Sequence, residues 1–319
     1  MKRVLIIPYF GDFPNYFQLF LNSCEKNLNY TWFIFTDNTK KYNYPKNVKI
    51  FKISFEELKK LFQNKFDFKI SLETPYKLCD FKPCYGYIFE EYIKGYNWWG
   101  HCDVDLIFGD LDKFISNEML EQYEKLFSLG HFTLYKNTKE NNRRFMKPFK
   151  GNFFYKKYLS QKGNFIFDEL YTNSINNIYE ELKIPYLDKI FCADIYTKSS
   201  NFKIVKGFNR KDKKYILEIF KKNLFTYENG KIFEYYIKNN ELVKKEYMYI
   251  HLQKRKMDIK INENKDCYKI IPNAFENMEY KNIDLNNFYK IKKKNFNLHY
   301  FKLRKKNLFI KIKKYIKNL

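Results

Sequence analysis

The sequence predicts an α/β protein with a mixed central sheet and flanking helices. Residues 3–8 (RVLIIP) form a continuous apolar run, which is typical of a strand buried on both faces. Apolar residues at helical spacing over 17–28 and a second apolar strand over 31–36 follow directly. Such a succession predicts a right-handed βαβ unit, whose ligands bind at the carboxyl ends of the strands. We therefore expect residues 8–11 and Asp37 at a binding edge.

A third strand and two helices are predicted next. Residues 48–53 form the strand, and Ser54 with Glu57 predicts a capping box at the start of a helix that ends near residue 66. Residues 83–95 predict a second helix. Three charged residues, Lys77, Asp80 and Lys82, would surround its N-terminus, where backbone N–H groups favour anions. They are candidates for a phosphate contact, and ordinary surface charge is the alternative.

Residues 96–108 (YNWWGHCDVDLIF) are the most informative stretch. Side chains alternate along a strand, so Asp103 and Asp105 are expected on one face of a buried strand, with Trp98 and Trp99 in the core and His101 near the site. Adjacent carboxylates in apolar surroundings require a cation, and oxygen ligands suit Mg²⁺ or Mn²⁺. The alternative is a surface turn with two solvated aspartates.

The rest of the body alternates further helices and strands. Helices are predicted over 109–115, 118–126 and 164–182, and a strand over 130–135. Asp168 and Glu169 would lie in the first turn of the helix over 164–182, where they either complement the helix dipole or act as catalytic or acceptor-binding carboxylates.

Asn229-Gly230 predicts a β-hairpin over 225–237, and a third strand follows over 242–252. His251 lies at the end of this last strand, with Lys254 just beyond it. We take His251 as the candidate third metal ligand, and a structural histidine is the alternative.

The charge distribution predicts a body over 1–285 and a cationic tail over 286–319. The formal net charge is +24, and residues 288–319 supply twelve Lys or Arg and no acidic residue. Residues 301–319 resemble a basic amphipathic helix on an anionic membrane surface; packing on the body or disorder are the alternatives. The N-terminus lacks the features of a signal peptide, and no stretch is long enough to cross a membrane, so we expect a cytoplasmic protein, peripheral on the inner face of the membrane.

Cysteine usage is consistent with this location. The six cysteines include no C-x-x-C pair, which predicts reduced thiols, and a zinc site is a minor alternative. The residues of that alternative are Cys79, Cys84 and Cys102.

These features together resemble a GT-A (Rossmann-like) glycosyltransferase. Residues 77–111 and the later YIHLQKRK resemble more closely a bacterial family of unknown function found among surface-polysaccharide genes, over about residues 1–280. More distantly, the chain is similar to retaining galactosyl- and glucosyltransferases that use D-x-D plus a late histidine. Those enzymes continue the histidine motif with glycine and a Lys-Trp pair, which HLQKRK lacks.

The resemblance implies a hexose transfer from a nucleotide-diphosphate sugar, favouring UDP, to a saccharide or lipid-linked acceptor of capsule or lipooligosaccharide. It implies Mn²⁺ or Mg²⁺ bound by Asp103, Asp105 and His251, and Asp168 or Glu169 near the reacting centre. The donor would contact Pro8, Tyr9, Phe10, Asp37, Lys77, Asp80, Lys82, Asp103 and Lys254.

Two other classes compete with this interpretation. A metal-dependent nucleotidyltransferase or phosphohydrolase would share the paired carboxylates, but the sequence has no glycine-rich phosphate loop. A nucleic-acid-binding protein would need its basic charge spread over the body, and half of the excess lies in the tail.

Overall fold

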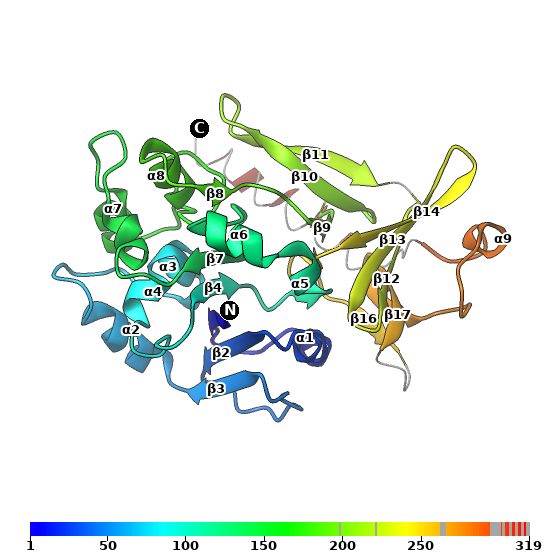
Figure 1. Cartoon of the computed structure of the whole chain (residues 1–319), viewed down its shortest axis with the longest axis horizontal. Helices are drawn as coiled ribbons and strands as arrows, with labels where there is room; N and C mark the ends of the chain where they lie inside the picture. The colour runs from blue at the N-terminus through cyan, green and yellow to red at the C-terminus, as the bar shows by residue number, and fades with distance from the viewer. Residues whose placement is uncertain are drawn as a thin grey trace.

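A computed structural model describes residues 1–197, 199–220, 222–261 and 266–293, together with 301, 304, 305, 308, 309, 312, 313 and 316. The chain is a mixed α/β protein with three sheets (Figure 1). This confirms the predicted class, although the proportion of strand is higher than expected. None of the described helices combines the length and the apolar character needed to cross a bilayer.

The central sheet has seven strands in the order β3-β2-β1-β4-β7-β6-β8. Its first four strands are parallel, which confirms the βαβ unit, and β7 is antiparallel to β4. In β1, Leu5 and Ile7 face one core and Val4 and Ile6 face the other, so this strand is buried on both sides. The strands are β1 (Arg3–Pro8), β2 (Tyr30–Thr36), β3 (Val48–Lys52), β4 (Trp98–Cys102), β6 (Lys125–Leu126), β7 (Phe132–Lys136) and β8 (Tyr186–Leu187).

Helices cover both faces of this sheet. Residues of α1 pack on the face of Leu5, and residues of α2, α3 and α4 pack on the opposite face. The α-helices are α1 (Phe17–Glu25), α2 (Phe55–Gln63), α3 (Leu78–Phe81), α4 (Tyr85–Ile88), α5 (Leu111–Phe114), α6 (Asn117–Gln122), α7 (Phe154–Ser160), α8 (Ile175–Glu181) and α9 (Leu285–Phe288), and the 3₁₀ helices are η1 (Pro75–Lys77), η2 (Lys82–Cys84) and η3 (Asn141–Met146).

Two predicted helices are wrong in part. The helix predicted over 83–95 is much shorter: only the end of η2 and α4 are helical, and residues 89–95 after Ile88 form turns. The helix predicted over 164–182 begins only after Ser174, whose capping box with Asn177 starts α8. The capping box of Ser54 and Glu57 at the start of α2 is present as predicted.

Two predicted strands each divide between sheets. The stretch 96–108 forms β4 in the central sheet and β5 (Leu106–Phe108) in a second sheet, so Asp103 and Asp105 lie in the connection rather than within one strand. The stretch 242–252 likewise forms β14 (Glu241–Tyr247) and β15 (Tyr249–His251). Trp98 and Trp99 are fully buried on opposite faces of β4, as predicted for core residues.

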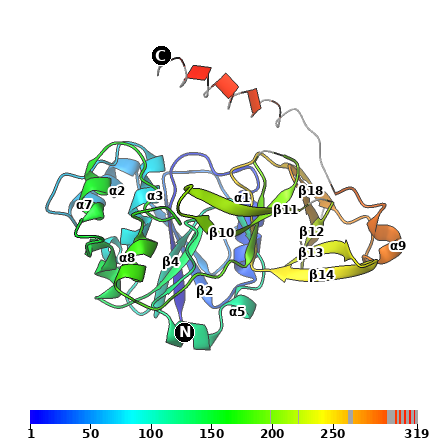
Figure 2. The same cartoon turned by 90° about the horizontal axis from the view of Figure 1, so that it is seen from above.

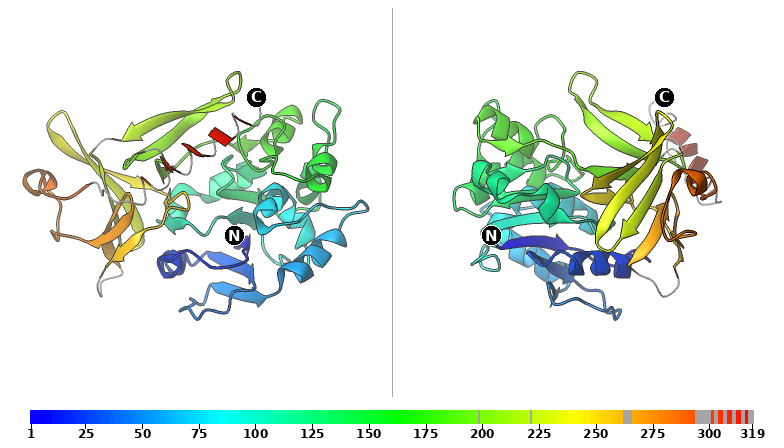
Figure 3. Two further views of the ribbon diagram at one scale, coloured as in Figure 1. Left: turned by 180° about the vertical axis from the view of Figure 1, so that it is seen from behind. Right: turned by 45° about the vertical axis from the view of Figure 1, so that its right-hand side comes forward.

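The predicted small hairpin addition is larger in the structure. The second sheet has the order β11-β10-β9-β15-β5, and a third sheet of six strands, β14-β13-β12-β17-β18-β16, lies at one end of the molecule (Figure 3). Asn229 and Gly230 have positive φ at the predicted turn between β12 and β13. The remaining strands are β9 (Cys192–Ile195), β10 (Phe202–Asn209), β11 (Lys214–Phe220), β12 (Leu224–Glu228), β13 (Lys231–Lys238), β16 (Asp258–Lys260), β17 (Cys267–Ile271) and β18 (Ala274–Asn277).

The body extends further than residue 285. Phe288 and Ile291 are buried against Leu224 and Tyr235, so the first residues of the predicted tail belong to the third sheet's core. Of the predicted amphipathic helix over 301–319, residues 302–303, 306–307, 310–311, 314–315 and 317–319 lie outside the described part. The described residues are helical and exposed, and they lie apart from the body (Figure 2).

Gly86 lies where α4 packs against β4, so a substitution there tests this packing. A Cβ atom at Gly86 would lie 2.2 Å from Cε2 of the Trp99 ring. Replacing a helical glycine by alanine ordinarily stabilises a helix. Here we expect Gly86→Ala to lower the free energy of unfolding by about 1–3 kcal/mol through overpacking, measured by urea denaturation.

Gly207→Ala is the matched control, because a Cβ there meets only Ile216 Cδ1 at 3.9 Å. A Gly86→Ala protein at least as stable as the wild type would contradict the packing described for Trp99.

Candidate metal centre

A pocket opens where the parallel strands β1 and β4 end. The loop after β1 forms one side, and the connection from β4 to β5 forms the other. This position at the carboxyl ends of parallel strands is the usual ligand site of open α/β sheets. The candidate site residues that line it are Pro8, Tyr9, Phe10, Lys82, His101, Asp103, Asp105 and Lys254, together with Cys79 and Cys102 of the zinc alternative.

The three predicted metal ligands are brought together at this pocket. One ligand atom each from Asp103, Asp105 and His251 lies within 4.8 Å of the others. Antiparallel pairing of β5 with β15 places Leu106 opposite His251, so the residue before β5 meets the end of β15. His251 lies behind Asp105, with its Nε2 atom 3.4 Å from Asp105 Oδ2.

The chemistry of these side chains fits a divalent cation. Asp105 is 2% exposed, and its Oδ1 atom is buried without a hydrogen-bond partner. An unsatisfied buried carboxylate oxygen is costly unless a cation or donor meets it. Two carboxylates and one imidazole nitrogen suit Mn²⁺ or Mg²⁺, with the remaining positions open to a substrate.

A strained turn after β15 completes the wall of the pocket. Gln253 and Lys254 both have positive φ, at 57° and 53°. Non-glycine residues in this region are uncommon and cluster at functional sites. The turn aims the backbone N–H of Lys254 at Asp105 Oδ2, at 2.5 Å, and places the Lys254 ammonium 4.7 Å from the centre of the Tyr76 ring.

The charges of His251 and the neighbouring carboxylates partly compensate one another without a bound cation. Burial alone would lower the pKa of His251, but the carboxylates of Asp105 and Asp194 raise it to about 10. A protonated imidazole therefore partly compensates the neighbouring carboxylates. A cation at this site would take over that compensation.

Lys82 joins the metal group to the predicted catalytic carboxylates. Its ammonium donates to Asp103 Oδ1 at 2.8 Å and to the Gly130 carbonyl at 2.8 Å, and it lies 3.2 Å from Asp168 Oδ2. Burial would lower the pKa of Lys82, but Asp103 and Asp168 raise it well above its usual value. Lys82 is therefore a fully charged, buried cation between two carboxylates.

Asp168 and Glu169 lie in the loop before α8 rather than on a helix. Their carboxyl groups pass so close to Gly130 that a Cβ atom there would lie 2.3 Å from Asp168 Oδ2. Burial raises the pKa of Asp168 to about 7, against the opposing effect of Lys82. Burial also raises the pKa of Glu169, whose Oε2 accepts a 2.8 Å hydrogen bond from the Tyr215 hydroxyl.

Three residues predicted to contact the donor lie elsewhere. The Lys77 ammonium is buried and bonds Asp80, Tyr158 O and Gly163 O, so its donors are occupied by the protein. Asp80 also accepts from the backbone N–H groups of Phe165 and Phe167. Lys77 and Asp80 therefore hold in place the loop that carries Asp168. Neither residue lines the pocket.

Asp37 also lies outside the residues that line the pocket. It is exposed and accepts a 2.9 Å hydrogen bond from the backbone N–H of Gly11, which supports the loop after β1. The expectation that Asp37 lies at the carboxyl edge of the sheet is confirmed, whereas its contact with a base stays a prediction.

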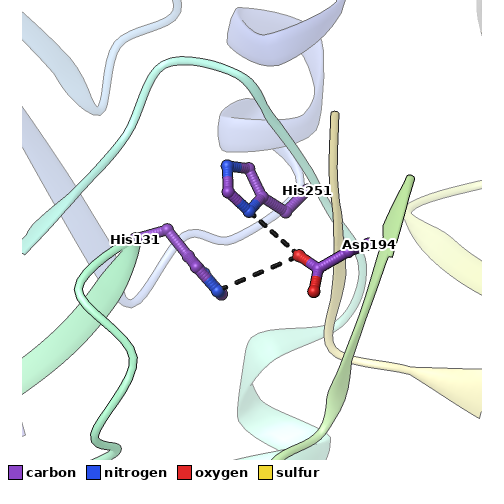
Figure 4. A group of neighbouring side chains, drawn as sticks. All are labelled: His131, Asp194 and His251. Atoms are coloured by element: carbon purple, nitrogen blue, oxygen red, sulfur yellow. Dashed lines mark hydrogen bonds and ion pairs between the residues drawn. The ribbon is translucent and has the colours of Figure 1, made fainter. Parts of the chain in front are cut away.

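Sequence reasoning missed a second cluster beside His251. His131, Asp194 and His251 also have ligand atoms within 4.8 Å of one another, and all three are buried (Figure 4). Asp194 interrupts an apolar run over 190–195, which is a signal of a buried carboxylate that the sequence does offer. No cysteine belongs to either group within the described part of the chain, so the zinc alternative gains no support.

Fold and site together define a mixed α/β protein with a candidate divalent-cation centre at the carboxyl edge of its parallel strands. The chain belongs to a family of unknown function, DUF6625, whose model matches residues 5–279. No curated protein sequence matches it.

Asp168 makes stability depend on pH. Its folded-state pKa of about 7 exceeds the ordinary value of 3.8, so the folded chain binds this proton more tightly than the unfolded chain. The resulting stabilisation is complete below about pH 4 and is lost by about 1.4 kcal/mol per pH unit as pH rises to about 7. We expect the stability of the wild type minus that of Asp168→Asn to decline over this window in urea denaturation.

Asp67→Asn, at an exposed aspartate, is the control for replacing one carboxylate by an amide. A wild-type advantage over Asp168→Asn that grows between pH 4 and pH 7 would contradict the assignment.

Proposed function

We propose that the protein is a metal-dependent glycosyltransferase that moves a hexose from a nucleotide-diphosphate sugar, with UDP as the favoured nucleotide, to a saccharide or lipid-linked acceptor. The observation that carries the proposal is the meeting of Asp103, Asp105 and His251 at a pocket beside the loop after β1. Paired carboxylates at such a pocket suit a cation that is shared with substrate phosphates.

The donor site follows from the lining of the pocket. Tyr9 stacks on Phe13 with ring centroids 4.8 Å apart, which holds an aromatic wall at the position where a base would lie. Asp103, Asp105 and His251 would hold a cation, which would compensate the negative charge that grows on a leaving diphosphate. Lys254, which also lines the pocket, would add a further positive charge.

Asp168 is our candidate for the carboxyl group at the reacting centre; it is 4% exposed and is not among the residues that line the pocket. The ammonium of Lys82 contacts both Asp168 and the proposed metal ligand Asp103. In an inverting reaction Asp168 would accept the proton of the acceptor hydroxyl, and in a retaining one it would stabilise the oxocarbenium ion. Its pKa of about 7 suits proton transfer near neutral pH.

The acceptor class is supported by the C-terminal segment. The described apolar residues Phe301, Leu308, Phe309, Ile312 and Ile316 are all exposed, and basic residues separate them. An exposed apolar and basic helix suits an anionic membrane surface, where lipid-linked saccharides lie. We therefore propose the inner face of the cell membrane as the location of the reaction, in surface-polysaccharide synthesis.

The donor assignment is tested by isothermal titration calorimetry. We expect one of UDP, GDP and CDP, with UDP favoured, to bind in the presence of Mn²⁺ and to lose measurable binding in EDTA. Asp105→Asn should abolish the Mn²⁺-dependent binding, whereas Asp67→Asn, at an exposed aspartate outside the pocket, should retain it. Absence of metal-dependent binding to all three nucleotides would refute the proposal.

Two further measurements separate the competing classes. A nucleotidyltransferase or phosphohydrolase would bind nucleoside triphosphates or release phosphate without transferring sugar. A nucleic-acid-binding protein would bind single-stranded RNA in a salt-dependent manner that survives removal of the tail.

Membrane association is tested by truncation after Lys293, which retains the buried Phe288 and Ile291. Each basic residue near an anionic surface contributes about 1 kcal/mol, so removal of the tail should abolish co-sedimentation with phosphatidylserine vesicles. The truncated chain should keep its Mn²⁺-dependent nucleotide binding. Equal sedimentation of both chains would refute the role of the tail.

A further inference from the structure

Asp194 lies at the centre of the buried cluster behind the proposed metal ligands. It comes from β9, which pairs in parallel with β15 so that Asp194 and His251 lie side by side. Its Oδ1 atom lies 2.9 Å from His251 Nδ1 and 4.0 Å from His131 Nε2 (Figure 4). The side chain is 2% exposed.

Two arrangements of this cluster are chemically distinct. Either His131, Asp194 and His251 hold a second cation, or Asp194 accepts a hydrogen bond that orients His251 toward the first one. In the first arrangement His251 would use Nδ1 for a cation; in the second, Nδ1 carries a proton and Nε2 is the ligand atom.

The contacts favour the second arrangement. The Nε2 atom of His251 lies 3.4 Å from Oδ2 of Asp105, which lines the pocket, whereas its Nδ1 atom faces Asp194, which does not. The other ring nitrogen of His131 is engaged by the Tyr249 hydroxyl at 2.9 Å. Gln253 and Lys203 also contact Asp194, at 3.3 Å and 3.5 Å, so its carboxylate is already surrounded by donors.

We propose that Asp194 is a positioning residue: it accepts the Nδ1 proton of His251 and thereby presents His251 Nε2 to a cation held by Asp103 and Asp105. A carboxylate behind a metal-bound histidine fixes the tautomer and ring orientation and raises the basicity of the ligand atom. The ring of His131, whose centroid lies 4.3 Å from that of His251 at an interplanar angle of 36°, packs against the imidazole and restrains it further.

This inference rests on the metal site of the proposed function, but it can fail separately. An asparagine at position 194 can turn its NH₂ group toward Nδ1 and so stabilise the wrong tautomer, with the proton on Nε2. The size and burial of the side chain are conserved in Asp194→Asn, so the change tests the hydrogen bond. Loss of an orienting partner of this kind weakens metal affinity about 10- to 100-fold.

The test is a titration of the full chain with Mn²⁺ alone, with free Mn²⁺ measured by electron paramagnetic resonance. We expect one ion per wild-type chain and affinity at least about 10-fold weaker in Asp194→Asn. Glu234→Gln is the matched control, because Glu234 is a 2% exposed carboxylate bonded to Tyr247 in the third sheet, away from the pocket. Its Mn²⁺ affinity should equal that of the wild type.

Three results would overturn the proposal, and they differ in what else they affect. Unchanged affinity in Asp194→Asn removes the role of Asp194 and leaves the proposed function intact. Two ions per chain, one of them lost in His131→Asn, assign the cluster to a second metal site. No Mn²⁺ binding to the wild type refutes the inference together with the metal site itself.

If Asp194→Asn does not fold, a measurement on the wild type tests the proposed tautomer of His251 instead. The chain has four histidines, so selective ¹⁵N-histidine labelling gives few signals. On addition of Zn²⁺ as a diamagnetic probe, we expect the His251 signals to report a proton on Nδ1 and a metal on Nε2. A proton on Nε2, or a metal-dependent shift at His131 Nε2 of the same size, would contradict the proposal.

Discussion

The buried ammonium of Lys82 is the interaction on which the candidate site depends. It holds Asp103 from the β4–β5 connection, the Gly130 carbonyl before β7 and Asp168 from the loop before α8. Removing a partner from a buried charge of this kind is costly, so the three segments are constrained to one arrangement. The position of Gly130 requires a residue without a side chain, because any larger residue would collide with Asp168 and Glu169. A proposed metal ligand and a proposed catalytic carboxylate are thereby held by one ammonium group.

The site lies at the boundary between two sheets. The chain leaves the central sheet after Cys102 and enters the second sheet at Leu106, and Asp103 and Asp105 occupy the intervening turn. β15 then brings His251 beside β5, and β9 brings Asp194 beside β15. The buried backbone of both sheets fixes the ends of this turn, so the carboxylates are preorganised without a cation. This arrangement explains why residues far apart in sequence meet at one pocket.

Sequence reasoning identified the residues with a local signal and missed those without one. Asp103, Asp105 and His251 end apolar runs, and the structure brings them together as expected. Asp194 is a single carboxylate in a short apolar run, and its partner His251 is recognisable only once β9 and β15 are paired. Lys77 and Lys82 look equivalent in sequence, yet the turns between them direct Lys77 to Asp80 and Lys82 to Asp103. The helix expected from residue 164 does not form because Phe165 and Phe167 donate to Asp80, and Ile166 and Asn173 adopt positive φ.

The central claim is that Asp103, Asp105 and His251 hold a divalent cation shared with a nucleotide diphosphate. The most direct measurement is anomalous diffraction at the manganese edge from crystals grown with Mn²⁺ and UDP. The account predicts one strong peak bounded by these three side chains, with the diphosphate on its open side and the base near Tyr9. A peak between His131 and Asp194, or nucleotide bound at the pocket with no ion beside Asp105, would contradict it.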